Sequence, residues 1–145
     1  MSRRVTIVGA GAIGGTVGAY LARAGHDVLM VDAAADHVAA MQRDGLEIQA
    51  FDETFRTPLE AATPDGLEGP LELVLLAVKA QHTEDAVARL ARLLAVDGTV
   101  VSLQNGLCER ALMGMRVVDW PGASQPEVFQ AVRAAILTRL WARTP

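Results

Sequence analysis

Apolar residues along this chain form two kinds of pattern, short continuous runs and helically spaced positions. The runs fall at residues 4–8, 27–31, 71–78 and 99–103, and such runs are typical of strands that are buried on both faces of a parallel sheet. Between them, three helices are predicted. The first carries Ile13, Val17, Tyr20 and Leu21 and stops at Gly25, the second runs from Asp36 to about Arg43, and the third runs from Thr83 to Ala95.

This alternation of strands and helices predicts the fold class. Strands joined by helices at this spacing imply right-handed crossovers, so we expect an α/β fold with a Rossmann-type doubly wound, mostly parallel sheet and helices on both faces. Three segments between the predicted strands and helices are not predicted as helices. Residues 46–50 and 54–57 pair as a small hairpin or form an irregular strand, residues 63–70 read as a loop, and Asp97-Gly98 turns the chain.

The third predicted helix, from Thr83 to Ala95, has one apolar face. Ala86, Val87, Leu90, Leu93 and Leu94 lie on that face, and Arg89 and Arg92 lie opposite.

After residue 106, a strand is predicted at residues 116–120 and a helix with an apolar stripe at residues 126–143. That stripe needs a partner surface, which the sheet, a second subunit or a further domain could supply. We therefore divide the chain into a dinucleotide-binding domain at 1–120 and a C-terminal helical segment at 121–145, and a homodimer is one way to cover the stripe.

Composition narrows the range of partners. The 145 residues suit one domain, and the net charge of -4 without a basic cluster argues against nucleic acid. The single Cys108 forms neither an internal disulfide nor a metal site, so we expect a cytoplasmic protein without a metal. The uncharged stretch of residues 5–22 resembles a membrane span, but its five glycines fit a strand, turn and helix better, and no membrane association is expected.

A glycine-rich turn follows the first strand. The string Gly9-Ala10-Gly11-Ala12-Ile13-Gly14 ends a strand and opens a helix near the N-terminus, which is the context that a dinucleotide-binding fingerprint requires. In that motif the first glycine permits the tight turn, the second lets the backbone approach the pyrophosphate, and the third allows close packing of helix on strand. The helix start offers free N–H donors to the anion. We predict that Gly9, Gly11, Ala12, Ile13 and Gly14 bind the cofactor.

Asp32 ends the second strand, 18 residues after Gly14. An acidic side chain at this place accepts a hydrogen bond from the ribose 2′-OH of NAD and repels a 2′-phosphate. The following residues 33–36 contain no Arg to receive such a phosphate, so the sequence favours NAD. The alternative is an aspartate that caps the next helix or lies in a loop.

Two polar residues follow buried strands at the same expected edge of the sheet. Lys79 is the only lysine among 13 basic residues and comes after the most apolar strand. Asn105 follows the next strand within Gln104-Asn105-Gly106. Ligands bind at the carboxyl edge of such sheets, although Lys79 could be an ordinary exposed lysine, and Asn-Gly is a common turn pair. His37 is expected to face solvent on its short helix.

These stretches together resemble the N-terminal domain of the ketopantoate reductases (2-dehydropantoate 2-reductases). The resemblance rests on residues 8–15, on Ala77-Val78-Lys79-Ala80 and on Ser102-Leu103-Gln104-Asn105-Gly106, and it covers about residues 4–120. It implies NADP-dependent reduction of a 2-keto acid on the route to pantothenate, with Lys79 and Asn105 as catalytic residues that also line the cofactor site. The family's second, helical domain carries a proton-donating lysine, so the resemblance implies that these 145 residues alone are inactive.

Two other function classes stay open at this point. One is a nucleotide-binding module without catalysis, which the lack of a second lysine favours. The other is a dehydrogenase of the hydroxyacyl-CoA or 6-phosphogluconate type with a similar N-terminal half. The cofactor is therefore NADP from the resemblance or NAD from Asp32.

Overall fold

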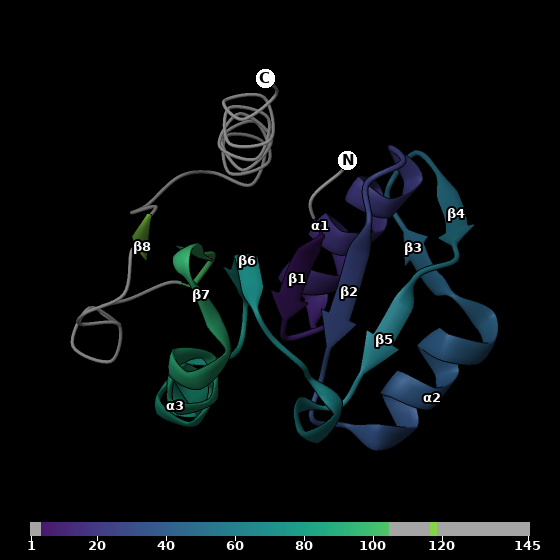
Figure 1. The fold of residues 1–145 in the computed structure, drawn as a ribbon. Coiled ribbons are helices and arrows are strands. Elements are labelled where there is room, and N and C mark those ends of the chain that lie inside the picture. The colour runs from purple at the N-terminus through teal and green to yellow at the C-terminus, as the bar shows by residue number, and fades with distance from the viewer. Residues whose placement is uncertain (1–3, 105–116, 119–145) are drawn as a thin grey trace.

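The computed structural model describes residues 4–104 and 117–118 and contains one central parallel sheet (Figure 1). Every neighbouring pair in this six-stranded sheet runs in the same direction. In spatial order, its strands are β5 (Glu60–Ala62), β2 (Val28–Val31), β1 (Val5–Val8), β6 (Leu71–Leu76), β7 (Leu94–Ser102) and β8 (Val117–Val118).

Helices cover both faces of the sheet. The helices are α1 (Ala12–Arg23), α2 (Ala35–Asp44) and α3 (Thr83–Leu93), with the short 3-10 helices η1 (Pro64–Gly66) and η2 (Ala80–His82). One hydrophobic core joins the sheet to α1 and α2, and a second joins it to α3. The predicted doubly wound α/β fold is confirmed by this arrangement.

The alternating residues of β1 explain the two cores. Val5 and Ile7 point into the core shared with α1 and α2, whereas Val8 belongs to the core beneath α3. Val5 and Ile7 are fully buried, and burying one such side chain contributes about 1.5–3 kcal/mol. Because β1 lies between β2 and β6 and is buried on both faces, its sequence is a continuous apolar run.

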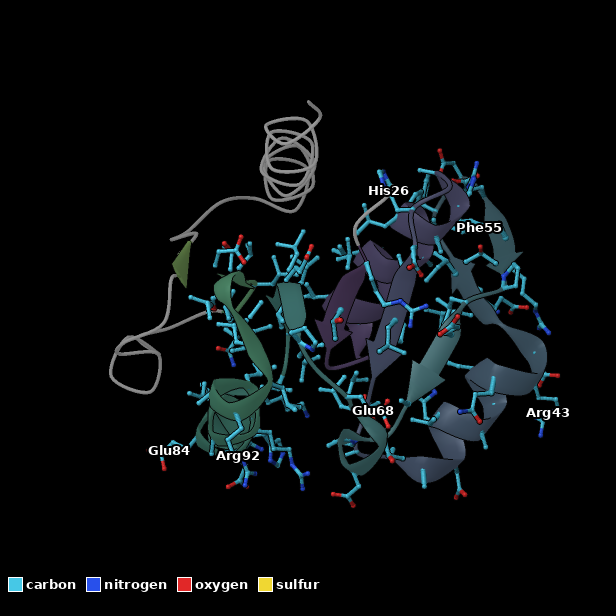
Figure 2. All side chains as sticks on the ribbon, viewed as in Figure 1. His26, Arg43, Phe55, Glu68, Glu84 and Arg92 are labelled. Carbon is cyan, nitrogen blue, oxygen red and sulfur yellow. The ribbon has the colours of Figure 1, made fainter. Side chains whose placement is uncertain are left out.

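Helix α3 follows its predicted amphipathic pattern. Val87 and Leu90 are buried against the sheet, whereas Figure 2 shows Glu84 and Arg92 on the side of α3 that faces away from it. The helix ends at Leu93, two residues earlier than predicted, because Leu94 already pairs with Leu71 at the start of β7. Asp97-Gly98, predicted as a turn between helix and strand, instead belongs to an irregular stretch within β7.

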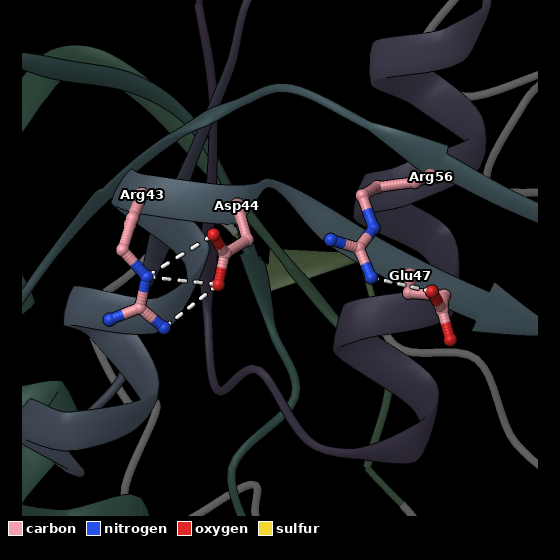
Figure 3. Close-up of polar contacts among 4 residues, drawn as sticks. All are labelled: Arg43, Asp44, Glu47 and Arg56. Atoms are coloured by element: carbon pink, nitrogen blue, oxygen red, sulfur yellow. Dashed lines mark hydrogen bonds and ion pairs between the residues drawn. The ribbon is translucent and has the colours of Figure 1, made fainter.

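Residues 46–57 form the hairpin that the sequence left as one of two alternatives. Strands β3 (Leu46–Gln49) and β4 (Thr54–Thr57) pair antiparallel, apart from the main sheet. Glu47 lies opposite Arg56 in the register, and their side chains form an ion pair of 2.7 Å (Figure 3). Strand β5 was not predicted from sequence; its three residues complete one edge of the sheet beside β2.

A polar and aromatic cluster fixes the hairpin to α1. Tyr20 and Phe55 pack edge to face with their ring centroids 5.0 Å apart, and the Arg23 guanidinium lies 4.4 Å from the Phe55 centroid. Arg23 also donates to a carboxylate oxygen of Glu53 at 2.9 Å. This cluster connects an isolated two-stranded sheet, which is only marginally stable alone, to the main fold.

Candidate functional site

The glycine turn lies between β1 and α1 and is built as its sequence predicts. Gly9 has a φ of +104°, and a Cβ there would lie 2.7–2.8 Å from backbone atoms of Ala77 and Val78. A Cβ on Gly14 would overlap the carbonyl oxygen of Gly9 and come within 3.0 Å of the Ala77 Cβ. The tight turn predicted for Gly9 and the close packing predicted for Gly14 are therefore both present.

Gly11 differs from these two glycines. A Cβ built on Gly11 has no neighbouring atom within 4 Å, and its φ of -76° suits any residue. Neither packing nor backbone conformation within the part of the chain that the structure describes requires glycine here. A small residue at this place leaves room beside the start of α1, as the approach of a pyrophosphate would need.

The start of α1 is suited to an anion. Gly11, Ala12 and Ile13 are all exposed, and the first turn carries no acidic side chain. The first N–H groups of a helix have no intrahelical acceptor, and the helix dipole adds a partial positive charge there. Ile13, with 39% of its surface exposed, adds an apolar side chain at the same end of the helix.

Asp32 contacts the glycine turn directly. Its Oδ2 accepts from the Ala10 N–H at 2.9 Å, and its Oδ1 accepts from the Ala34 N–H at 2.9 Å. Helix α2 begins after Ala34, and no side chain caps it, so Asp32 is not its N-cap residue. Each carboxylate oxygen has a further lone pair, so Asp32 can hold the turn and still accept from a ribose hydroxyl.

The expectation that His37 faces solvent is wrong. His37 is half-buried in the first turn of α2, and its Nε2 lies 3.1 Å from the carbonyl oxygen of Ala10. Side chains in a helix lean toward its N-terminus, and the N-terminus of α2 adjoins the end of β2, next to β1. The sequence position of His37 after Asp32 was the signal that could have identified this contact.

The end of β6 completes this edge of the sheet. Ala77 donates to the Val8 carbonyl at 2.8 Å, which brings the residues just before Lys79 against the glycine turn. Lys79 is exposed at the start of η2, and its ammonium group forms no ion pair with any side chain of residues 4–104.

Gln104 bridges the ends of β6 and β7. The side chain of this buried residue donates from Nε2 to the Val78 carbonyl and to the Thr83 hydroxyl, both at 2.7 Å. It thereby fixes the backbone on either side of η2, including the residue before Lys79. Sequence reasoning gave Gln104 no separate role, although a polar residue directly after a buried strand was a usable signal. Asn105, the next residue, lies outside the described residues, as do the predicted helix at 126–143 and the segment 121–145.

A surface cavity of about 780 Å³ lies between the loop around η1 and strands β1, β2, β5 and β6. It is lined by residues near the starts of the strands, including Arg4, Glu60 and Glu72, and by the loop around η1. None of the predicted cofactor residues lines it, so the glycine turn is the better candidate site. None of the helices within the described ranges is long and apolar enough to cross a membrane.

Comparison with known proteins gives consistent similarities. The family model of the ketopantoate reductases PanE/ApbA matches residues 5–140. A 2-dehydropantoate 2-reductase of Mesorhizobium japonicum is 38% identical over 104 residues, which cover 72% of this chain and 32% of that protein. This chain thus spans about a third of the length of the curated relatives that it matches.

Solved structures show the same likeness. A PanE/ApbA family ketopantoate reductase from Ralstonia eutropha JMP134 aligns with a TM-score of 0.71 and 32% identity, over 81% of this chain and 40% of that one. A ternary structure of D-mandelate dehydrogenase with NADH and anilino(oxo)acetate aligns with a TM-score of 0.72 and 26% identity, over 82% and 40% of the two chains. Both likenesses extend over most of this chain.

Proposed function

This chain belongs to the ketopantoate reductase family PanE/ApbA, and we propose that it is the nucleotide-binding domain of an NAD(P)H-dependent 2-keto acid reductase. The observation that carries the proposal is the glycine turn. Gly9 and Gly14 are required by the protein's own packing, whereas the space at Gly11 is explained by a ligand that approaches the start of α1. We assign Gly9, Gly11, Ala12, Ile13, Gly14 and Asp32 to the cofactor.

We propose NADH rather than NADPH as the preferred cofactor. The Asp32 carboxylate at the end of β2 would repel a 2′-phosphate, and residues 33–36 provide no Arg to bind one. The similarity to a D-mandelate dehydrogenase that was solved with NADH supports this choice. The family resemblance, which implies NADPH, makes the opposite choice, so the preference is a direct test of the role of Asp32.

Lys79 and Asn105 are proposed to act on the substrate. Bound NAD(P)H supplies the hydride to the keto carbon, and the protein positions and polarises the carbonyl. The Lys79 ammonium is a compact donor that can bind the keto oxygen and stabilise its developing negative charge. An Asn105 amide can donate to the same oxygen or accept from a ligand hydroxyl. The exposed end of Lys79 and its position beside the turn support this assignment.

The substrate contacts and the proton donor are proposed to lie largely outside these 145 residues. The curated relatives are about three times as long as the matched region, and Lys79 is the only lysine of this chain. We propose residues 1–120 as the nucleotide-binding domain and 121–145 as a helical segment that leads toward a substrate domain or a second subunit. A cytoplasmic location suits the single cysteine.

Fluorescence titration of the 145-residue polypeptide with NADH and NADPH tests the cofactor proposal. We expect NADH to bind at least about tenfold more tightly than NADPH, which corresponds to about 1.4 kcal/mol. In the Asp32→Ser variant this ratio should approach one. Equal affinities in the unchanged chain would contradict the preference for NADH, and no binding of either nucleotide would contradict the cofactor site itself.

A pair of glycine variants tests the site. Gly11→Ala adds a methyl group that touches no described atom, so the polypeptide should keep its melting temperature. The methyl group should obstruct the pyrophosphate, and NADH affinity should fall at least about tenfold, which is a loss of about 1.4 kcal/mol of binding free energy. Gly66→Ala is the matched control, because its Cβ would make only ordinary contacts at 3.9 Å in η1. A Gly11→Ala variant with unchanged NADH affinity would argue against a pyrophosphate at this turn.

A further inference from the structure

His37 is bonded to the carbonyl side of the glycine turn. Its Nε2 lies 3.1 Å from the Ala10 carbonyl oxygen. Because a carbonyl oxygen only accepts hydrogen bonds, Nε2 must carry the proton in this contact. The side chain is half-buried between α2 and the turn, so the bond is partly shielded from competing water.

Asp32 holds the other side of the same residue. Its Oδ2 accepts from the Ala10 N–H at 2.9 Å. Ala10 lies between Gly9 and Gly11, and glycines adopt many more backbone conformations than other residues. Two side chains from outside the turn therefore fix a segment whose own sequence leaves it flexible. They come from β2's end and from α2, so the turn depends on both elements.

The His37 bond also sets the direction of the next N–H group. In a trans peptide unit the C=O and the N–H point in opposite directions, so the Ala10 carbonyl and the Gly11 N–H form an opposed pair. The Ala10 carbonyl faces the protein, since a Cβ on Gly15 would lie 3.4 Å from it. The Gly11 N–H therefore points away from this packed side. A Cβ built on Gly11 has no atom within 4 Å, so a ligand has room beside this residue.

We infer that His37 is a positioning residue that aims the Gly11 N–H at the cofactor's pyrophosphate. It acts through the Ala10 peptide and does not itself touch the ligand. The inference rests on the proposed function, because the pyrophosphate is the group that the turn is proposed to bind. It adds a residue of α2 to a site otherwise built from the ends of β1, β2 and β6 and from the start of α1.

Two ligands separate this role from a general structural one. ADP-ribose contains the pyrophosphate, whereas adenosine contains only the ribose and base. In His37→Phe, which fills the space without a donor, we expect ADP-ribose affinity to fall about 5- to 20-fold and adenosine affinity to stay within twofold. In His37→Gln, whose amide can still donate to the Ala10 carbonyl, ADP-ribose affinity should remain within about threefold of the unchanged chain.

His26→Phe is the matched control. His26 is also half-buried, but it lies before β2, at the opposite edge of the sheet (Figure 2), and this variant should bind both ligands normally. Calorimetry and ligand-observed NMR would measure the two affinities, with a melting curve for each variant.

The outcomes distinguish the two proposals. An equal loss of both ligands in His37→Phe, or no loss of either, would overturn the role of His37 while leaving the cofactor site in place. Failure of His37→Gln to restore ADP-ribose binding would also overturn it. If the unchanged polypeptide bound neither ADP-ribose nor NADH, the proposed function would fail, and the inference about His37 would fail with it.

Discussion

At the scale of single residues, the three glycines of the turn at residues 9–14 serve different physical purposes. Gly9 is needed because its φ is positive and its Cα lies against the backbone of Ala77 and Val78. Gly14 is needed because α1 packs on the Gly9 carbonyl. Only Gly11 has no such requirement within the described chain. The fingerprint thus contains two glycines that the packing of the fold requires and one, Gly11, for which we propose a bound ligand as the reason.

Gly9→Ala tests the first of these reasons. A methyl group at Gly9 would clash with backbone atoms at 2.7–2.8 Å and would strain a φ of +104°. We expect the free energy of unfolding to fall by about 3 kcal/mol. Urea denaturation would measure it, with Gly66→Ala as the control that changes little. A Gly9→Ala variant as stable as the unchanged chain would mean that the turn can rearrange.

Gln104→Leu tests the bridge between β6 and β7. The change removes a buried amide that donates to the Val78 carbonyl and to the Thr83 hydroxyl. Losing a donor to buried acceptors costs about 1–3 kcal/mol, and we expect a loss of this size in urea denaturation. Gln81→Leu, at an exposed position in η2, is the matched control and should change stability by less than about 0.5 kcal/mol. Equal effects of the two changes would contradict a bridging role.

At the scale of elements, the strands and helices with strong apolar patterns were predictable from sequence. The runs that became β1, β2, β6 and β7 are apolar because those strands are buried on both faces. Strand β5 escaped prediction because its three residues, Glu60–Ala62, carry no such run and are ordered by pairing with β2. The end of α3 was misplaced because Leu94 has an apolar side chain that suits either the helix or the strand.

In the candidate site, too, local motifs were predictable from sequence and contacts between distant segments were not. Gly9, Gly14 and Asp32 were identified because a local motif specifies their spacing. The contact of His37 with Ala10 joins residues 27 positions apart, and that of Gln104 with Val78 joins residues 26 apart. Such contacts depend on how separate elements pack, so the sequence can single out a polar residue that follows a buried strand but does not identify its partner.

The hairpin of β3 and β4 is the element whose stability should depend on pH. Hydrogen bonds from Arg23 and from Arg56 lower the pKa of Glu53 and of Glu47, respectively, below the usual range. A carboxylate with a lowered pKa stabilises the folded state above the pKa of the unfolded chain, near 4.3, and this contribution is lost as the pH falls further.

Glu53→Gln tests this dependence, because glutamine does not titrate. We expect the melting temperature of the unchanged chain to exceed that of the variant by ~1–2 °C at pH 7, and this difference should disappear near pH 3. The side chains of Arg23 and Glu53 are 47% and 36% exposed. High salt should therefore screen their attraction and reduce the difference in melting temperature at pH 7. A difference that is the same at both pH values would contradict an ionic contribution from Glu53.

At the scale of the whole molecule, the proposed cofactor site lies where the two hydrophobic cores meet. The glycine turn contacts α1 and α2 on one face of the sheet, and the end of β6 leads into η2 and α3 on the other. A ligand held at this edge would contact elements of both cores and would bind only the folded state. Cofactor binding should therefore stabilise the entire described domain rather than the turn alone.

The stabilisation of the fold by bound ligands also tests where the substrate binds. With NADH at a hundredfold its Kd, the free energy of unfolding should rise by about 2.7 kcal/mol, seen as a higher melting temperature. The Gly11→Ala variant should show no rise at the same NADH concentration. Adding a 2-keto acid such as 2-dehydropantoate to the NADH complex should give no further rise, because most substrate contacts are proposed to lie outside these 145 residues. A further rise that Lys79→Ala removed would instead mean that Lys79 gives this domain measurable substrate affinity without the contacts proposed to lie outside it.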